Sequence, residues 1–254
     1  MHIIGMSLRH EKTNGRNCMN IVDIIILAIL FLSVIYGLYR GFIRTLLNVG
    51  CLLGALFVAF SFSGKLADAV LSNEGIVSTL STYTESTQKV GDLDLAGSDV
   101  SSLTDSLIEK VLENVNLPEP IAVLLRNNLS TQSFAQSGVT SVNDYVSGTI
   151  VSSVVDILSF LLCFAAAYIV LALFMSLIHH IFKFKVLRAA DSLVGGAFGL
   201  LRGFLLLYIL FLLVPVLSTI IPLDAFDEAI DASKLASLFA SDGFFAQVIA
   251  GKLF

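Results

Sequence analysis

The chain has 254 residues, of which 56% are hydrophobic and only 14% are charged, and its formal net charge is −5. Soluble domains carry roughly 25% charged residues, and their apolar residues recur at helix or strand spacing, whereas here they gather in long blocks. This composition excludes an ordinary soluble domain and predicts an integral membrane protein.

The first eighteen residues, MHIIGMSLRHEKTNGRNC, are polar and basic, and a second candidate initiator, Met19, follows them. The apolar run beyond Met19 is long, and no small-residue cleavage site follows it, which argues against a removed signal peptide. We expect residues 1–18 to be an N-terminal extension that is not native, with Met19 as the natural start.

Four runs are apolar and long enough to cross a bilayer, which takes about 20 residues per helix. They cover about residues 21–38, 46–62, 154–178 and 193–217. Short connections, YRGFIRT and HHIFKFKVLRAAD, join the first run to the second and the third to the fourth. We therefore predict an all-α integral membrane protein with four transmembrane helices in two hairpins, at residues 19–63 and 151–221.

The two short connections set the expected orientation, because Lys and Arg in short loops stay in the cytoplasm. The five basic residues in these turns are Arg40, Arg44, Lys183, Lys185 and Arg188. We expect both turns to be cytoplasmic and the middle segment and both termini to lie outside. Three basic residues before Met19 oppose this orientation unless the chain starts at Met19.

A polar segment, residues 64–150, separates the hairpins and holds eleven acids and four bases, a charge that argues against a nucleic-acid partner. Within it, SLTDSLIEKVLENV places its apolar residues on one helical face, and PEPIAVLLRNNL starts a second amphipathic helix. Because two short helices cannot form a core alone, their apolar faces are expected to pack together, bind a partner or lie on the membrane surface. An amphipathic tail is expected over residues 222–254.

Two aspartates lie a few residues inside the predicted spans, Asp23 in the first and Asp156 in the third. In the expected topology they enter the membrane from the same side. Each is interpreted as solvated at the membrane edge or in contact with a partner, or else the two form a protonatable pair that faces a small cavity.

A short repeat, GLYRGF at residues 37–42 and GLLRGF at 199–204, puts Arg40 and Arg202 beside glycines at the edge of apolar runs. We expect the fourth crossing proper to begin at Arg202. Both arginines would then lie at the cytoplasmic face, where Asp191 or lipid head groups pair with them. The two copies would act as matched pivots that bring the hairpins together.

Glycines at intervals of four residues mark the expected helix contacts, because small residues at this spacing let helix backbones approach closely in lipid. They are Gly37, Gly41, Gly50, Gly54, Gly195, Gly199 and Gly203. The pattern predicts a compact bundle with specific packing.

No metal-ligand spacing, phosphate-binding loop or nucleophile triad occurs in the sequence. His179 and His180 are adjacent and point about 100° apart on a helix, which makes them a poor metal pair. The three cysteines are interpreted as small packing residues. We expect no catalytic residue, no cofactor, no metal and no enzyme activity.

Two blocks resemble the colicin V production protein family (CvpA). NIVDIIILAILFLSVIYGLYRGFIRTLLNVGCLLG resembles the family's opening, with an aspartate at the head of the first span and an arginine-glycine pair at its end, and DSLVGGAFGLLRGFLLL resembles its second block. The matching residues are Asp23, Arg40, Gly41, Asp191, Gly195, Phe198, Gly199, Arg202 and Gly203. The family often has a base where this chain has Ser192.

The resemblance implies a multi-pass protein of the bacterial plasma (inner) membrane that is associated with toxin (colicin V, bacteriocin) production or export and with envelope homeostasis. We expect it to be non-enzymatic and to act in the lipid bilayer through membrane or export partners. The alternative is a small channel or transporter that uses Asp23, Asp156 and Arg202 as polar points. Four spans with so few polar residues would need a homo-oligomer to form a pore.

Overall fold

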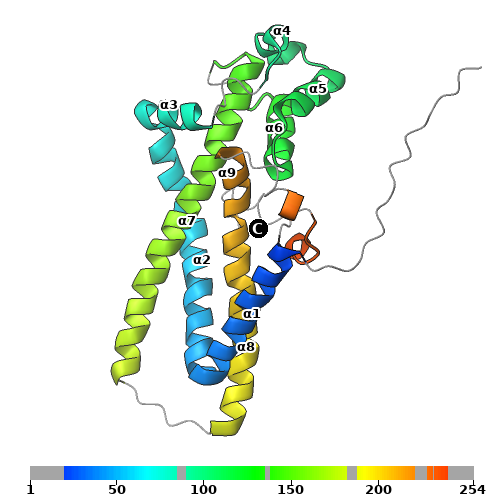
Figure 1. Cartoon of the computed structure of the whole chain (residues 1–254). Coiled ribbons are helices and arrows are strands. Elements are labelled where there is room, and N and C mark those ends of the chain that lie inside the picture. The colour runs from blue at the N-terminus through cyan, green and yellow to red at the C-terminus, as the bar shows by residue number, and fades with distance from the viewer. Residues whose placement is uncertain are drawn as a thin grey trace, which may run out of the picture.

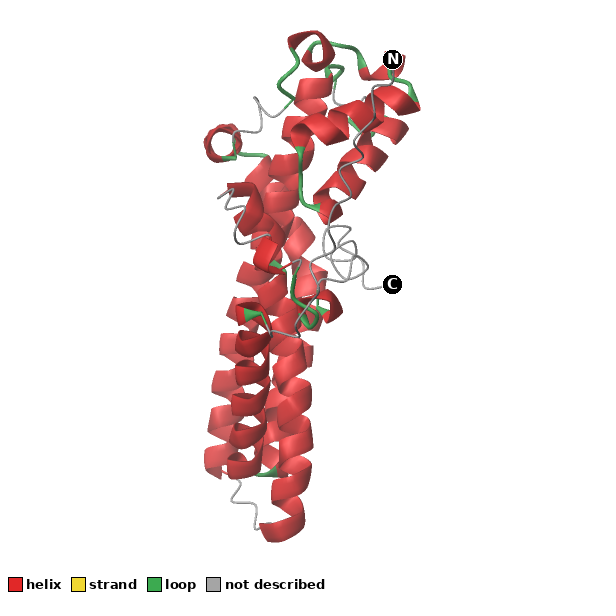
Figure 2. Cartoon of the chain, turned by 45° about the vertical axis from the view of Figure 1, so that its right-hand side comes forward, coloured by secondary structure: helices red, strands yellow, loops and turns green. Residues whose placement is uncertain are grey.

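The computed structural model describes residues 20–84, 90–134, 138–181, 188–220, 228–230 and 232–239. The expected start at Met19 lies outside these residues, and so do the side chains of His179, His180 and Asp191. The described part is helical, with short connections and no strand (Figure 2).

Four of the described helices are long and apolar enough to cross a membrane. They are α1 (Ile21–Arg40), α2 (Phe42–Leu71), α7 (Val142–Ile181) and α8 (Arg188–Phe211), and α9 (Leu213–Ile220) continues the last one. The short break before α9 has a local cause, since Pro215 has no N–H to donate to the preceding turn. The prediction of an all-α membrane protein with four spanning helices is confirmed, and the arrangement agrees with two hairpins.

The helices of the two hairpins interleave. α2 packs along α7, α8 packs along both α2 and α1, and α1 and α2 contact each other little, so the order across the bundle is α7, α2, α8, α1 (Figure 1). The α1–α2 connection, the last turn of α7 and the first turn of α8 lie at the same end of the bundle, which we call the turn end (Figure 1). Each hairpin therefore depends on the other for its packing.

The bundle core lies where α2, α7 and α8 meet. Ala55 and Ala59 of α2 are fully buried, and these small side chains let α7 approach closely. Phe60 of α2 packs edge to face on Phe160 of α7, with ring centroids 4.9 Å apart. Such an edge-to-face pair adds about 0.5–1.5 kcal/mol to the energy of burial.

The polar middle segment folds into a small helical lobe, which we define as residues 90–134 with the first turns of α7. Its helices are α4 (Leu93–Ala96), η1 (Val100–Ser102), α5 (Asp105–Val115) and α6 (Glu119–Thr131), while α3 (Glu74–Tyr83) lies apart on α2 and α7. α7 has 40 residues and is about 60 Å long, twice the roughly 30 Å of a bilayer core, so it projects far enough to carry the lobe.

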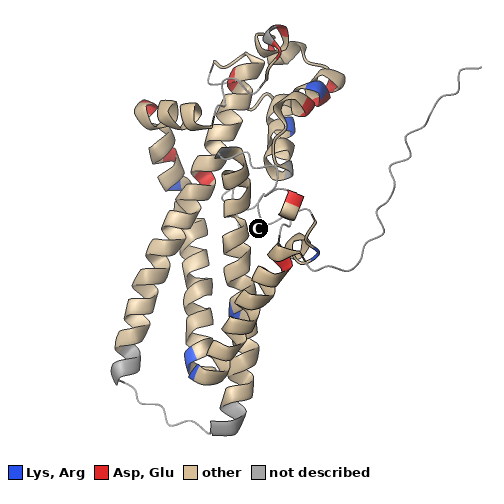
Figure 3. Ribbon diagram, viewed as in Figure 1, with Lys and Arg blue, Asp and Glu red and all other residues tan. Residues whose placement is uncertain are grey.

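The apolar faces of α5 and α6 pack on this projection of α7. Val111 and Leu125 are fully buried and share one hydrophobic cluster with Tyr145 and Ile150 of α7. Of the three expectations for these faces, packing is the one that the structure shows, and α7 supplies the core that the two short helices lack. The acidic residues gather at this end of the molecule (Figure 3).

Two aspartates at the edge of the lobe stabilise its first turns. The N–H groups of Leu95 and Asp94 donate to Asp92, and the N–H and hydroxyl of Ser101 donate to Asp99. The bond from Leu95 lowers the pKa of the Asp92 carboxyl, and the bonds from Ser101 lower the pKa of Asp99. Hydrogen bonds to the charged form favour that form.

Acid is therefore expected to loosen the lobe before the bundle. The folded-state pKa values lie below the ordinary 3.8, so the stabilisation is complete above pH 3.8 and is lost as the pH falls through the lower folded values. Peptic cleavage of the lobe should rise as the pH is lowered from about 5 to about 2. Asp99→Asn keeps an oxygen acceptor that does not titrate and should weaken this dependence. Asp94→Asn, whose side chain accepts no described hydrogen bond, should leave it unchanged, and an equal effect of both would contradict the assignment.

Candidate functional site between α1 and α8

α1 and α8 cross at glycines that leave no room for a side chain. A Cβ on Gly199 would overlap the carbonyl oxygen of Ser33, and a Cβ on Gly37 would overlap that of Gly195. A Cβ on Gly195 would lie 2.8 Å from the carbonyl carbon of Gly41. All these neighbours are backbone atoms, which cannot move aside as a flexible side chain does. The two backbones are therefore in direct contact, as in other small-residue interfaces in membranes.

The other expected packing glycines differ in their surroundings. A Cβ on Gly203 would lie 3.1 Å from Ser33 Cβ, and one on Gly54 would lie 3.2 Å from Leu171 Cδ1. A Cβ on Gly50 would meet nothing within 4 Å, so the expectation of close helix packing is wrong at this position. The close contacts are concentrated between α1 and α8.

Two serine hydroxyls fasten the same interface. Ser33 Oγ donates to the carbonyl oxygen of Gly199 at 2.7 Å, and Ser192 Oγ donates to that of Leu38 at 2.9 Å. The bond from Ser192 links the start of α8 to the end of α1. Hydrogen bonds between helices within a membrane contribute about 0.6–2 kcal/mol each.

The α1–α2 turn consists of one residue, Gly41, with φ 81°, a conformation that L side chains rarely adopt. The N–H of Gly41 donates to the carbonyl of Gly37, and the Thr45 hydroxyl donates to the carbonyl of Gly41. Phe198 of α8 packs edge to face on Phe42, the first residue of α2, with ring centroids 5.2 Å apart. The aromatic pair therefore holds the turn against α8.

The two arginines of the repeat meet at one aromatic ring. Arg40 Cζ lies 5.0 Å and Arg202 Cζ 4.6 Å from the centroid of the Tyr36 ring. Side chains lean toward the N-terminus of their helix, which for α8 is the turn end, so Arg202 extends toward Tyr36 from deeper in the bundle.

The two copies of the repeat meet, since a Cβ on Gly37 would lie 3.0 Å from Gly199 Cα, but their backbones differ. GLYRGF spans the break at Gly41, whereas GLLRGF lies within the unbroken helix α8. α8 runs unbroken through Arg202, so no bend in the helix marks the expected start of the crossing there. The expected pairing of Asp191 with an arginine of the repeat involves a side chain that lies outside the described residues.

Asp23 connects residues 232–239, which we call the C-terminal piece, to the start of α1. The carboxylate accepts hydrogen bonds from Ser233 Oγ at 2.6 Å, Leu235 N at 3.0 Å and Asn20 N at 3.2 Å. The residue is 6% exposed, so Asp23 is not solvated at the membrane edge. Nearby, Phe239 packs against Phe204, Tyr208 and Phe211 of α8.

Asp23 and Asp156 do not form a pair. Asp156 is half-buried on α7, which packs against α2, while Asp23 is on α1, which packs against α8. The charge that acts on Asp156 is that of Asp68 on α2. The two carboxylates that the sequence places at similar depth therefore belong to separate environments.

Three residues of the site were not singled out from the sequence. Ser33 continues the small-residue series of Gly37 and Gly41 at intervals of four, and Tyr36 lies one turn before Arg40, so both carried a readable signal. Ser233 carried none, because its bond to Asp23 joins residues more than two hundred positions apart.

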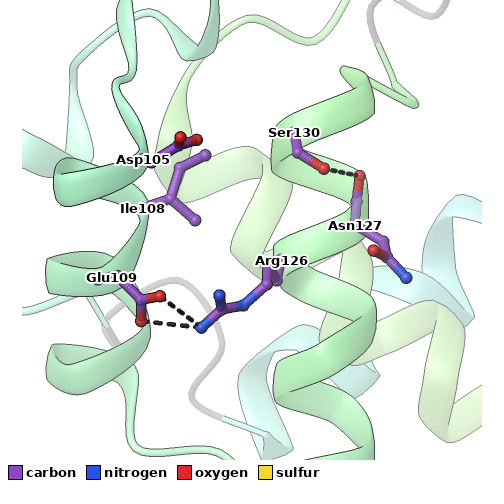
Figure 4. A pocket seen from close by; sticks show the side chains of 6 residues that line it. All are labelled: Asp105, Ile108, Glu109, Arg126, Asn127 and Ser130. Carbon is purple, nitrogen blue, oxygen red and sulfur yellow. Dashed lines mark hydrogen bonds and ion pairs between the residues drawn. The ribbon is translucent and has the colours of Figure 1, made fainter.

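A shallow, open pocket lies between α5 and α6 (Figure 4). It is lined by Asp105, Ile108, Glu109, Arg126, Asn127 and Ser130. Arg126 and Glu109 form an ion pair across it at 2.7 Å, but both side chains are about half exposed, so the pair contributes about 0–1 kcal/mol. Among the described residues, no group of three or more His, Cys, Asp or Glu could hold a metal ion.

A comparison with protein families gives a match over most of the chain. The family model described as "Colicin V production protein" matches residues 22–87 and 129–243. This match takes in all four spanning helices and both halves of the α1–α8 interface, and it leaves out most of the lobe. No curated protein and no solved structure matches the chain.

Proposed function

The chain belongs to the colicin V production protein family, and from this premise we propose that it is a non-enzymatic protein of a bacterial inner membrane. In this proposal it supports the production or export of a toxin of the colicin V type, together with envelope homeostasis, and it acts through partner proteins. The observation that carries the proposal is the family match over the whole membrane bundle.

The gap in the match suggests how the work is divided. Residues 88–128, which include α4, η1, α5 and most of α6, lie outside the matched ranges. The function common to the family would then depend on the bundle, and the lobe would bind a partner that is specific to this protein. The long α7 supports this division, because it holds the lobe well beyond the membrane.

The exposed face of α5 favours a partner with a basic surface. Asp105, Glu109 and Glu113 are exposed on α5, and only Glu109 has a described ion-pair partner on α6. Lys110 of α5 is also exposed, but it pairs with Asp92, so the face keeps a net negative charge that steers a complementary protein to it. The basic turn end favours an orientation with the turns in the cytoplasm and the lobe outside.

Charge reversal on the lobe tests the proposal. A photo-crosslinker placed on the exposed face of α5 should capture a defined membrane or periplasmic protein, and Asp105→Lys with Glu113→Lys should abolish both the capture and toxin release. Glu74→Lys, an exposed reversal on α3 outside the lobe, should change neither. Equal capture and equal toxin release in the wild type, the double variant and Glu74→Lys would contradict the proposed role of the lobe.

One observation favours the channel alternative, since Arg202 is a cation inside the bundle whose Nε is buried and donates no hydrogen bond within the described structure. Ion flux into liposomes that contain the purified protein separates the two functions. We expect no flux above that of empty liposomes. Flux that Arg202→Ala or Asp23→Asn abolishes would replace the proposal with a homo-oligomeric channel.

A further inference from the structure

Two positively charged side chains, Arg40 of α1 and Arg202 of α8, lie over the same aromatic ring, that of Tyr36. Both guanidinium carbons lie within 5.0 Å of the Tyr36 centroid. The π face attracts each cation, but the two guanidinium groups repel each other, and this repulsion is stronger beside a bilayer than in water. A cluster of this kind is stabilised by an anion that contacts both groups.

The neighbouring helices supply no such anion among the described side chains. Asp23 on α1 is more than three turns away from Tyr36 and already accepts three hydrogen bonds. α2 has Arg44 near the turn and no acid before Asp68. Arg202 Nε is buried and donates no hydrogen bond within the described structure. The acid of α8, Asp191, has a side chain outside the described residues, and neither guanidinium group has a hydrogen-bond partner among the described side chains.

We propose that Arg40, Tyr36 and Arg202 form a binding site for a phosphate-bearing anion at the turn end of the α1–α8 interface. A guanidinium group presents its N–H donors in a planar fork that matches two phosphate oxygens. Arg202 approaches the ring from α8 and Arg40 from α1, so one phosphate between them would bridge the two helices. The anion would thereby stabilise the glycine contact described above.

The surface beside the site suits a phospholipid. Leu32, Tyr36 and Arg40 follow one another at intervals of four and lie on one side of α1. Leu32 is 65% exposed and suits contact with an acyl chain, while Arg40, also exposed, lies at the end of the span where head groups are found. Basic sites between transmembrane helices bind anionic head groups in this way. Free phosphate offers the same chemistry without the chain.

The test compares lipid nanodiscs made of phosphatidylcholine alone with discs that also contain phosphatidylglycerol. Wild-type protein should melt at a higher temperature in the second kind, and native mass spectrometry should find bound phosphatidylglycerol. Arg202→Gln and Arg40→Gln should each weaken that binding about tenfold. Arg44→Gln, which removes an exposed arginine without a described ring contact, should bind as the wild type does.

Inorganic phosphate, added to phosphatidylcholine discs, identifies the source of the anion. A rise in melting temperature with phosphate alone assigns the site to a free anion, and a rise with phosphatidylglycerol alone assigns it to a lipid. Arg40→Gln decides the result if Arg202→Gln fails to fold, because Arg40 is exposed. The proposal is overturned if the wild type responds to neither anion, or if all three variants respond as the wild type does. Toxin release and flux do not enter this test, so its outcome is independent of the proposed function.

Discussion

Gly199→Leu is expected to separate α1 from α8 and to leave little folded protein in the membrane. A Cβ at this position already overlaps the backbone of Ser33, and the rest of a leucine side chain has no space beyond it. Overpacking a filled core costs about 1–3 kcal/mol even where side chains can adjust, and the neighbour here is backbone. Since a folded domain has only about 5–15 kcal/mol of stability, a cost above about 3 kcal/mol would remove a large share of it. The thermal midpoint and the monodisperse fraction after detergent extraction measure the effect.

Gly50→Leu is the matched control, because it makes the same change on the exposed side of α2, where a Cβ meets nothing within 4 Å. Replacing glycine by leucine in an exposed helix should, if anything, raise helix stability by several tenths of a kcal/mol. Arg202→Lys, which keeps the charge near Tyr36, should also be milder than Gly199→Leu. If Arg202→Lys proved the more damaging change, the guanidinium and not the glycine contact would hold the bundle together.

The parts of the fold that the sequence predicted are those set by local pattern. Each spanning helix follows from an apolar run of bilayer length, and the amphipathic pattern of α5 placed Val111 and Val115 on the face that is buried. The glycine series predicted a close contact and included both sides of it, Gly37 and Gly199. In each case a few residues within one helix carry the whole signal.

The arrangement of the helices in space could not be read in the same way. A helix that is apolar on every side does not show which neighbour it prefers, so the interleaved order α7, α2, α8, α1 was not predicted. α8 continues through Arg202, whereas an arginine in an apolar run is most simply assigned to its edge. A long side chain that extends toward the turn end allows the deeper position.

The link between the two ends of the chain is the other feature that sequence could not supply. Asp23 was recognisable as a polar residue inside a span, but its donors, Ser233 and Leu235, come from a tail with no distinctive motif. This link gives the carboxylate a role in the bundle without any need for proton transfer. It also gives α1 a contact besides α8 and α2, with the short helix η3 (Ala236–Leu238).

Asp23→Ala is therefore expected to release the C-terminal piece while the bundle stays assembled. The substitution removes the acceptor for Ser233 Oγ and for the N–H groups of Leu235 and Asn20, leaving these donors unsatisfied. Lys234 is exposed but lies within the fastened piece, so trypsin should cut there about tenfold faster or more once the piece opens.

Mass spectrometry of the trypsin products gives the measurement, because cleavage after Lys234 yields a C-terminal fragment that begins at Leu235. Ser233→Ala removes a single donor and should produce an intermediate rate, whereas Asp94→Ala, an exposed aspartate of the lobe, should not alter it. A rate that stays at the wild-type value in Asp23→Ala would mean that the aromatic contacts of Phe239 with α8 hold the piece by themselves. The family's first aspartate would then need another explanation, and contact with a partner protein would become the leading one.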